Sequence, residues 1–279
     1  MPVRLIAIDI DGTLLDSRWQ LPEANVTAIA EAARRGILVV LATGRRFDFA
    51  RPVLGRLPAV EIIITSGGAA TKTRDGASVA RRVLPAHLAR RVLAGTTAFR
   101  AEMGVVFDRV GPDQLVYERV AWDDPRHRAY FERNRQALAE VAPLEACLTE
   151  DPIQIMGAGG VDRMRALAAA LAGLPDATRF EVALTEYPAR DLSILDVTAA
   201  GVSKGSAVAD RARARGRPAE SVMAIGDNLN DESMLQVAGV PVVMANAPAA
   251  LMAPGRLSTA SNDQSGVAQA ILKYALDSG

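Results

Sequence analysis

The chain of 279 residues contains little cysteine, few aromatic residues and no long apolar run. Its single cysteine, Cys147, cannot form a disulfide within the chain, which argues against the small disulfide-rich class and agrees with a reducing compartment. The first apolar run covers only residues 5–8 before Asp9 interrupts it, and this is far too short for a signal peptide or a membrane span. We therefore expect a cytoplasmic protein with no membrane association.

An excess of charge of either sign is also missing. Lys and Arg number 32 and Asp and Glu number 32, so the formal net charge is zero. No global field would draw such a chain to nucleic acid or to an anionic membrane, and any phosphate site must be local. The hydrophobic share of 49% is enough for a sizeable core in one large domain or two ordinary ones. We expect a soluble monomer or small homo-oligomer whose partner is a small molecule.

Apolar runs and helical segments alternate at both ends of the chain. Residues 5–8, 37–42 and 62–65 are short apolar runs, separated by helical spacing over 22–35 and 47–57. After residue 203 the same alternation resumes with a helix over 203–215, strands over 222–225 and 240–244, and a closing helix over 266–276. Strand and helix in alternation indicate an α/β fold with a doubly wound parallel sheet.

The middle of the chain has a different texture. Stretches of alternating character lie at 105–107, 114–120, 153–156 and 180–184, with helices expected at 85–99, 125–139 and 161–174. This pattern is typical of an antiparallel sheet covered by helices on one side. We predict a core domain of residues 1–83 and 191–279, interrupted by an inserted α+β domain of residues 84–190. His87 and His127 are expected on exposed helix faces and receive no role.

Polar residues follow the predicted parallel strands at the points where the strands end. Asp9 and Asp11 follow the first strand, Thr43 the second, and Asp227 the strand over 222–225, while Lys204 opens a helix. In an open α/β sheet the ligand lies outside the carboxyl ends of the strands, so these side chains are expected together. Carboxylates with hydroxyls and one lysine can hold a hard cation such as Mg²⁺ beside a phosphate group. These residues are suited to phosphoryl transfer. One aspartate can attack phosphorus, while a second, kept partly protonated by anionic neighbours, donates a proton to the leaving oxygen and later activates water.

The order of these motifs resembles a known family. Asp9-x-Asp11-Gly12-Thr13, Thr43, Lys204 and Gly226-Asp227-x-x-Asn230-Asp231 are similar to the four motifs of the haloacid dehalogenase (HAD) superfamily of aspartate-nucleophile phosphatases. The size and position of the insert, with Ala42-Thr43-Gly44-Arg45 and Gly201-Val202-Ser203-Lys204-Gly205, resemble its Cof-type subgroup (type IIB), which has a Rossmann-like core and a large α/β cap. The resemblance covers nearly the whole chain.

The resemblance implies a role for each matching residue. Asp9 would be the nucleophile and Asp11 the general acid/base, while Mg²⁺ would be held by Asp9, Asp227 and the backbone carbonyl of Asp11, with Asp231 supporting the metal or Lys204. The phosphoryl group would be bound by Thr43, Gly44, Lys204 and Asn230. The implied activity is hydrolysis of a small phosphomonoester, such as a sugar phosphate, through an aspartyl-phosphate, with the insert closing as a lid.

Several alternatives stay open at this point. A phosphosugar mutase on the same scaffold would return the phosphoryl group to the sugar, and a silent binding protein would be expected to lack Asp9, Asp11 or Asp227. Thr43 and Asn230 could be ordinary helix caps, and Arg45 and Arg46 could reach a substrate phosphate or stay on the surface. Ser66-Gly67-Gly68-Ala69 departs from the Ser-Asn-Gly-Ala of the subgroup. Specificity is expected in the cap, where Arg109, Arg179, Glu186, Tyr187 and Arg190 are candidates.

Overall fold

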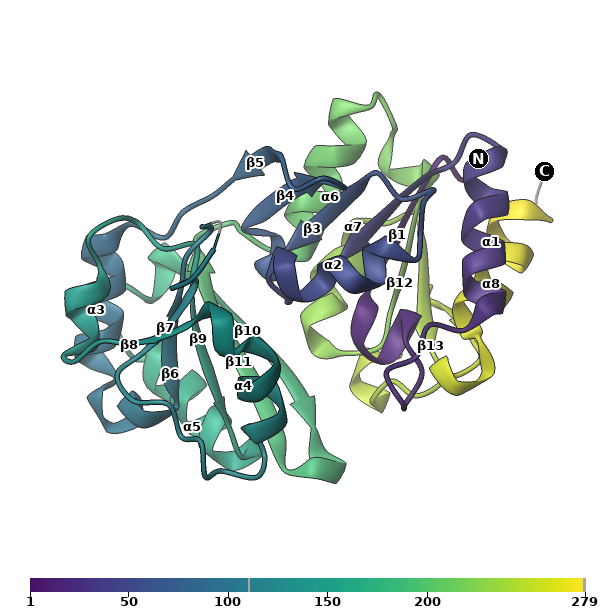
Figure 1. Cartoon of the computed structure of the whole chain (residues 1–279). Coiled ribbons are helices and arrows are strands. Elements are labelled where there is room, and N and C mark those ends of the chain that lie inside the picture. The colour runs from purple at the N-terminus through teal and green to yellow at the C-terminus, as the bar shows by residue number, and fades with distance from the viewer. Residues whose placement is uncertain (110, 278–279) are drawn as a thin grey trace. The chain divides into compact units, whose positions relative to one another are not determined.

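The computed structural model describes residues 1–109 and 111–277. The chain divides into two compact units, of which unit 1 comprises Met1–Ala80 and Ser203–Gly279 and unit 2 comprises Arg81–Val202. The boundary predicted at residues 190–191 falls inside a hairpin of unit 2, between strands β10 (Phe180–Tyr187) and β11 (Leu192–Ala199) (Figure 1). The alternating sequence of β11 was the signal that the sequence analysis did not use.

Unit 1 is built on an eight-stranded sheet. Its order is β14-β13-β12-β1-β2-β3-β4-β5. The bounds are β1 Leu5–Ile8, β2 Leu38–Ala42, β3 Ile62–Thr65, β4 Ala70–Thr73, β5 Ser78–Arg81, β12 Val222–Gly226, β13 Val240–Met244 and β14 Leu257–Thr259. The strands from β14 to β3 are parallel neighbours, and β4 joins β3 antiparallel. Since both faces of the parallel part are covered, its strands read as continuous apolar runs.

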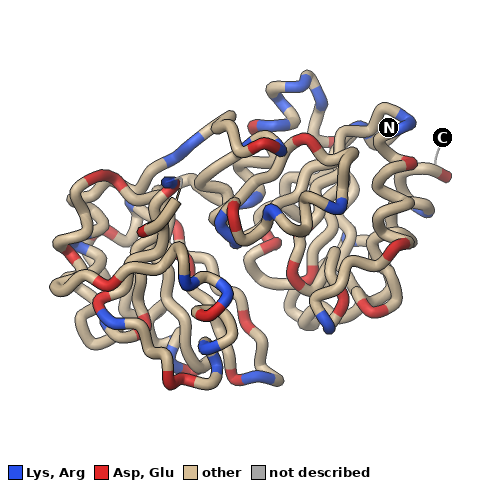
Figure 2. The backbone as a smooth tube through the Cα atoms, viewed as in Figure 1, with Lys and Arg blue, Asp and Glu red and all other residues tan. Residues whose placement is uncertain are grey.

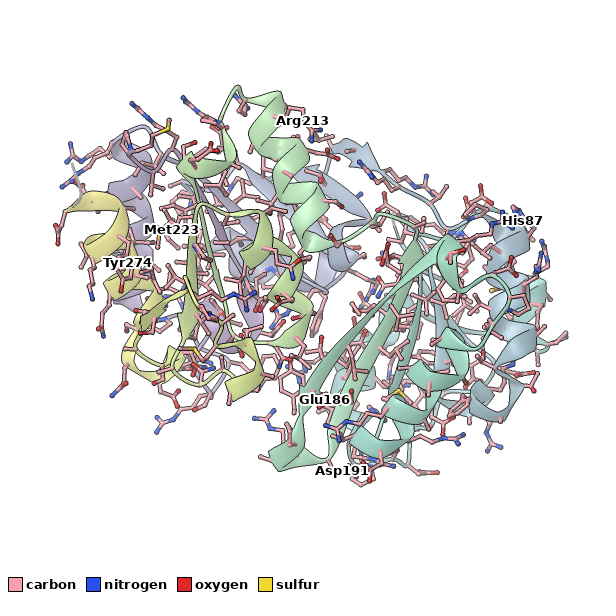
Figure 3. The ribbon with its side chains drawn as sticks, turned by 180° about the vertical axis from the view of Figure 1, so that it is seen from behind. His87, Glu186, Asp191, Arg213, Met223 and Tyr274 are labelled. Atoms are coloured by element: carbon pink, nitrogen blue, oxygen red, sulfur yellow. The ribbon has the colours of Figure 1, made fainter. Side chains whose placement is uncertain are left out.

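Helices cover both faces of this sheet, as the predicted doubly wound fold requires (Figure 1). On one face α1 (Glu23–Arg34), α2 (Phe47–Gly55) and α8 (Gly266–Ile271) bury the side of β1 that carries Ile6 and Ile8. On the other face α6 (Lys204–Ala214) and α7 (Glu232–Val237) pack against the side that carries Leu5 and Ala7. In Figure 3 Met223 of β12 lies among packed side chains, whereas Arg213 of α6 points outward.

Strand β1 lies at the point where the strand order reverses. The chain runs from β1 outward through β2 and β3 in one direction, and β12, β13 and β14 continue outward on the other side of β1. Ile8, the last residue of β1, pairs in register with Ile225 near the end of β12. The residues that follow these two strands are therefore brought side by side, at the place where α/β sheets bind ligands.

Unit 2 contains a six-stranded sheet with the order β10-β11-β9-β6-β7-β8. Its remaining strands are β6 (Met103–Val106), β7 (Leu115–Tyr117), β8 (Leu138–Glu140) and β9 (Gln154–Gly159). The neighbours are antiparallel, as predicted, except for β7 and β8, which are parallel. The helix predicted over 125–139 is wrong at its end, because residues 138–140 form β8.

Helices α3 (Ala86–Gly95) and α5 (Val161–Ala172) cover one face of this sheet and bury Val105, Ile155 and Leu195. The third helix, α4 (Arg128–Asn134), contacts the opposite side through Phe131, whose ring meets Tyr117 edge-on at 5.5 Å. Tyr117 follows the core residue Val116 in β7, and successive strand residues face opposite ways. The expectation of helices on one side alone was therefore wrong.

Two predictions about unit 2 side chains have different outcomes. His87 is exposed, as expected (Figure 3), whereas His127 is buried against the Phe131 ring with Asp124 at its Nδ1, so its predicted exposure is wrong. Among the candidates for specificity, Arg109 forms an ion pair with Glu150 at 2.6 Å and Glu186 with Arg165 at 2.8 Å. These side chains already have partners within unit 2.

Charged residues of both signs are interspersed along both units (Figure 2), in keeping with the net charge of zero. Among the residues that the structure describes, the helices are all too short or too polar to cross a membrane.

Candidate active site

Asp9 lies directly after β1 and is almost completely buried, at 4% exposure. Its backbone N–H donates to the Ile225 carbonyl at 3.1 Å, so the register of β1 with β12 fixes its position. The Lys204 ammonium donates to Asp9 Oδ1 at 2.6 Å and to Asp231 Oδ1 at 2.7 Å. Charge-assisted hydrogen bonds of this length are strong, and here a lysine lies between two buried carboxylates.

The first turn of α6 explains how Lys204 reaches this place. Ser203 caps the helix, accepting from the Ser206 N–H at 3.1 Å, which fixes Lys204 as the first helical residue. Gly205 then lets α6 approach α7, since a Cβ there would lie 2.1 Å from the Ser233 carbonyl oxygen. Glycine is required at this close approach, which brings Lys204 to Asp231 at the start of α7.

Asp227 follows β12 and is held by neighbours from two segments. The Thr13 hydroxyl donates to Asp227 Oδ1 at 2.7 Å. Asp231 Oδ2 accepts from the backbone N–H groups of Asp227 and Asn228 at 3.0 and 3.1 Å. The short turn η9 (Leu229–Asp231) thus brings the Asp231 carboxylate back to the end of β12.

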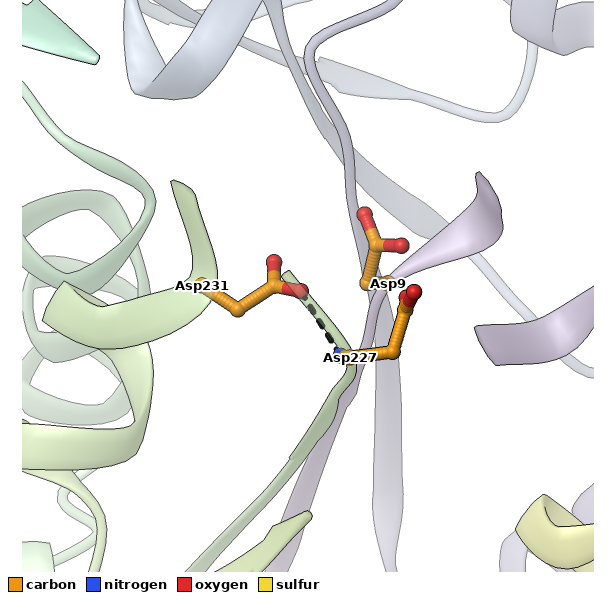
Figure 4. A group of neighbouring side chains, drawn as sticks. All are labelled: Asp9, Asp227 and Asp231. Atoms are coloured by element: carbon orange, nitrogen blue, oxygen red, sulfur yellow. Dashed lines mark hydrogen bonds between the residues drawn. The ribbon is translucent and has the colours of Figure 1, made fainter. Parts of the chain in front are cut away.

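Asp9, Asp227 and Asp231 form one acidic cluster (Figure 4). Each offers an oxygen within 4.8 Å of the others, and in the part of the chain that the structure describes this is the group that could hold a metal ion. Carboxylate oxygens are the ligands that hard divalent cations such as Mg²⁺ prefer. These carboxylates therefore fit a divalent cation, and Asp231 contacts Lys204, one of the two supporting roles expected for it from the sequence.

The electrostatics of the cluster point the same way. Burial, followed by the charge of Asp231, raises the pKa of Asp9 well above its usual value, against the lowering effect of Lys204. Burial and Asp231 likewise raise the pKa of Asp227 to about 7, although the Thr13 hydroxyl opposes this. Burial by itself would lower the pKa of Lys204, but the charges of Asp231 and Asp9 outweigh it and raise that pKa. Lys204 bonds two of the three buried carboxylates, and a bound cation would offset the remaining negative charge.

Asp11 is directed to a different partner. Its carboxylate accepts two hydrogen bonds from Arg45, from Nε at 2.8 Å and from Nη2 at 2.5 Å. Arg45 is therefore not a free surface residue, which was one of the two roles considered from sequence. The immediate partner of Asp11 is a cation, whereas the sequence analysis expected carboxylates around it.

Three of the predicted phosphate-binding residues, Thr43, Gly44 and Asn230, follow strands β2 and β12, which flank β1. Thr43 follows β2, is fully buried, and its hydroxyl accepts the Arg45 N–H at 3.1 Å, with Gly44 between them. Asn230 is half-buried in η9, next to Asp231.

Ser66, after β3, has a positive φ of 49° and a buried hydroxyl without a hydrogen-bond partner among the described residues. Such strained, unsatisfied groups are concentrated at functional sites.

One further side chain at this edge was missed. Asn246 follows β13, as the other site residues follow their strands, and its amide contacts Gly12 and Asp227. The signal was present in the sequence, since Asn246 is the first polar residue after β13, and polar residues that follow parallel strands are the pattern that found Asp9 and Asp227.

Comparison with known proteins agrees with this geometry. Residues 6–271 match the family of haloacid dehalogenase-like hydrolases. A putative phosphatase of Streptococcus pyogenes is 26% identical over 294 residues, which cover 99% of this chain and 100% of that protein. A chloroplastic endoribonuclease YBEY of Arabidopsis thaliana is 28% identical over 283 residues, which cover 97% of this chain and 46% of the relative. This chain thus spans about half the length of that relative and the whole of the putative phosphatase.

A solved structure described as the HAD subclass IIB sugar phosphatase BT4131 superposes with a TM-score of 0.77, at 20% identity, over 97% of this chain and 98% of that one. At this identity the likeness shows the fold, a HAD core with an inserted cap. Since the family match spans residues 6–271 and a relative matched over its full length is named a phosphatase, this chain belongs to the haloacid dehalogenase-like hydrolases, as an enzyme of the Cof-type phosphatase group.

Proposed function

We propose that this chain is a Mg²⁺-dependent phosphatase that hydrolyses a sugar phosphate or a related small phosphomonoester through an aspartyl-phosphate on Asp9. The observation that carries the proposal is the contact of Lys204 with Asp9 and Asp231 beside Asp227, at the point where the strand order reverses. The sugar class is supported by the similar fold of a protein described as a sugar phosphatase. Unit 2 is proposed to be the cap, and the cytoplasmic location stays a prediction.

In the first step an oxygen of Asp9 attacks phosphorus. The bond from phosphorus to the ester oxygen breaks, and the leaving oxygen takes a proton from Asp11. In the second step Asp11 accepts a proton from water, the water oxygen attacks phosphorus, and the acyl-phosphate bond breaks to release inorganic phosphate and regenerate Asp9. Asp11 therefore acts first as an acid and then as a base.

The other polar groups are proposed to bind the phosphoryl group and to counter its charge. Lys204 already touches Asp9, so its charge lies where an anionic nucleophile would meet an anionic substrate. Thr43, Gly44 and Asn230 would donate hydrogen bonds to phosphoryl oxygens. Asp9, Asp227 and the Asp11 backbone carbonyl would hold Mg²⁺, which when bound neutralises negative charge at the site.

The experiment is phosphate release from sugar phosphates, nucleotides, cofactor phosphates and an aryl phosphate, each with Mg²⁺ and with chelator. Release that requires Mg²⁺ and is strongest for the sugar phosphates supports the proposal. Release that is unchanged by chelator contradicts the metal dependence. Positional isomerisation of a phosphosugar without release would favour the mutase.

A further inference from the structure

Asn246 links three separate segments of unit 1 at the acidic cluster. Its amide nitrogen Nδ2 donates to the Gly12 carbonyl at 2.9 Å and lies 3.4 Å from Asp227 Oδ2. Its oxygen Oδ1 accepts the backbone N–H of Asn262 at 3.0 Å. The residue is exposed, so these contacts, and not core packing, account for its place.

Asn262 extends the same contacts to the other side of the turn that follows Asp9. Its amide Nδ2 donates to the Leu15 carbonyl at 2.9 Å, and Asn262 itself is buried. Gly12 and Leu15 lie in and directly after the turn η1 (Ile10–Leu14). Asn246 and Asn262 thus hold the carbonyls at both ends of the segment that carries Thr13, and Asp11 comes directly before that segment.

The orientation of the Asp227 carboxylate depends on the same contacts. Thr13 donates to Oδ1, Asn246 approaches Oδ2, and the carboxylate packs against the Gly12 backbone so closely that a Cβ there would lie 2.3 Å from Oδ2. Each carboxylate oxygen therefore has a side-chain donor beside it. Without Asn246, only the Thr13 donor of this pair would remain, and the Asp227 carboxylate could rotate about its Cβ–Cγ bond.

We propose that Asn246 is a positioning residue of the cation site. It keeps the Asp227 carboxylate and the Gly12 turn in the positions that metal binding requires. The inference rests on the proposed Mg²⁺ dependence and adds a residue to it. Hydrogen-bonded groups that orient metal ligands contribute about 10–100-fold to metal affinity or activity. Removing this amide should weaken cation binding while leaving the packed core unchanged.

The test measures metal binding without turnover. Metal-free native protein, Asn246→Ala and Asn246→Asp are titrated with MgCl₂, and the rise in melting temperature at each concentration gives an apparent dissociation constant. Gln269→Ala is the matched control, because Gln269 is also an exposed amide that donates to a backbone carbonyl, that of Gln264, and its bond does not involve the cluster. We expect about a tenfold or greater rise in the apparent dissociation constant for Asn246→Ala and no change for Gln269→Ala.

Asn246→Asp separates positioning from charge. It keeps the shape of the side chain and adds a negative charge, which by attraction alone would tighten cation binding, but it removes the donor. We expect weaker Mg²⁺ binding here too. A second readout is kcat at saturating substrate over a Mg²⁺ series, where both variants should require more Mg²⁺ for half-maximal rate.

Three results would overturn the inference. Native affinity in Asn246→Ala, with a clear Mg²⁺ response in the native protein, refutes the role of Asn246 and leaves the proposed function standing. Absence of any Mg²⁺ response in the native protein refutes both. Loss of folding in both variants would make Asn246 a structural residue and refute a positioning role.

Discussion

Arg45 and Asp11 form a two-bond ion pair, with distances of 2.8 and 2.5 Å between guanidinium nitrogens and carboxylate oxygens. The Arg45 guanidinium also lies over the Phe49 ring at 4.8 Å and the Trp19 ring at 5.5 Å. Trp19 has a positive φ of 62°, a conformation that bulky residues rarely adopt. Two aromatic rings therefore help to fix the guanidinium that orients the proposed general acid/base.

Arg45→Lys should lower kcat by roughly tenfold, because lysine keeps the charge but cannot make two parallel bonds or stack as a guanidinium does. Steady-state kinetics on the best substrate of the panel would measure it, with the exposed Arg51→Lys as control. An unchanged kcat would mean that Asp11 works without this pair. A raised KM at constant kcat would instead assign Arg45 to substrate binding.

Lys204→Met should destabilise the metal-free protein by about 3–5 kcal/mol, since it leaves Asp9 and Asp231 buried without their cation. Urea unfolding in chelator, followed by circular dichroism, measures the loss. Lys273→Met, at an exposed lysine, is the control and should unfold like the native protein. If Lys204→Met were as stable as the native protein, the Asp9 and Asp231 carboxylates would lose no free energy of unfolding without their cation, and this prediction would be wrong.

The metal-free protein should lose stability as the pH rises from about 4 to about 7. Asp227 has a pKa of about 7 in the folded state, where burial is the main cause, against about 3.9 in an unfolded chain. Between these values the folded protein binds a proton that the unfolded chain does not, so the free energy of unfolding falls with pH, by at most about 1.4 kcal/mol per unit for this group.

Asp227→Asn should reduce that slope, and saturating Mg²⁺ should counteract the loss because the cation takes over the role of the proton. Thermal unfolding at several pH values in chelator is the measurement. A slope that is the same in the native protein and in Asp227→Asn would refute this account of Asp227.

The sequence predicts which site residues meet at the carboxyl ends of the parallel strands. Asp9 and Asp227 are neighbours because β1 and β12 pair in register, and Lys204 reaches Asp9 and Asp231 because a glycine lets α6 pack closely on α7. The order of strands and polar residues along the sequence was enough to expect that these residues lie close together. The Gly12 turn was also visible, since glycine there allows a φ of 83°.

Contacts made by loop side chains could not be derived in this way. The Arg45–Asp11 pair and the Asn246–Gly12 bond depend on how irregular segments are placed in three dimensions, and neither periodicity nor propensity encodes that placement. In unit 2 the end of the predicted helix over 125–139 was wrong because Leu138 and Ala139 pair with β7, a tertiary contact that overrides local preference. His127 was misplaced for a similar reason, because Phe131 and Asp124 bury it.

The proposed mechanism depends above all on whether Asp9 carries the phosphoryl group. Native protein, Asp9→Asn and the control Asp48→Asn are mixed with ³²P-labelled substrate and Mg²⁺, quenched in acid within one turnover, and assayed for protein-bound label. We expect labelled native protein and labelled Asp48→Asn, and neither label nor phosphate release in Asp9→Asn. Label on Asp9→Asn, or phosphate release by it above about a tenth of the native rate, would contradict covalent catalysis at this aspartate.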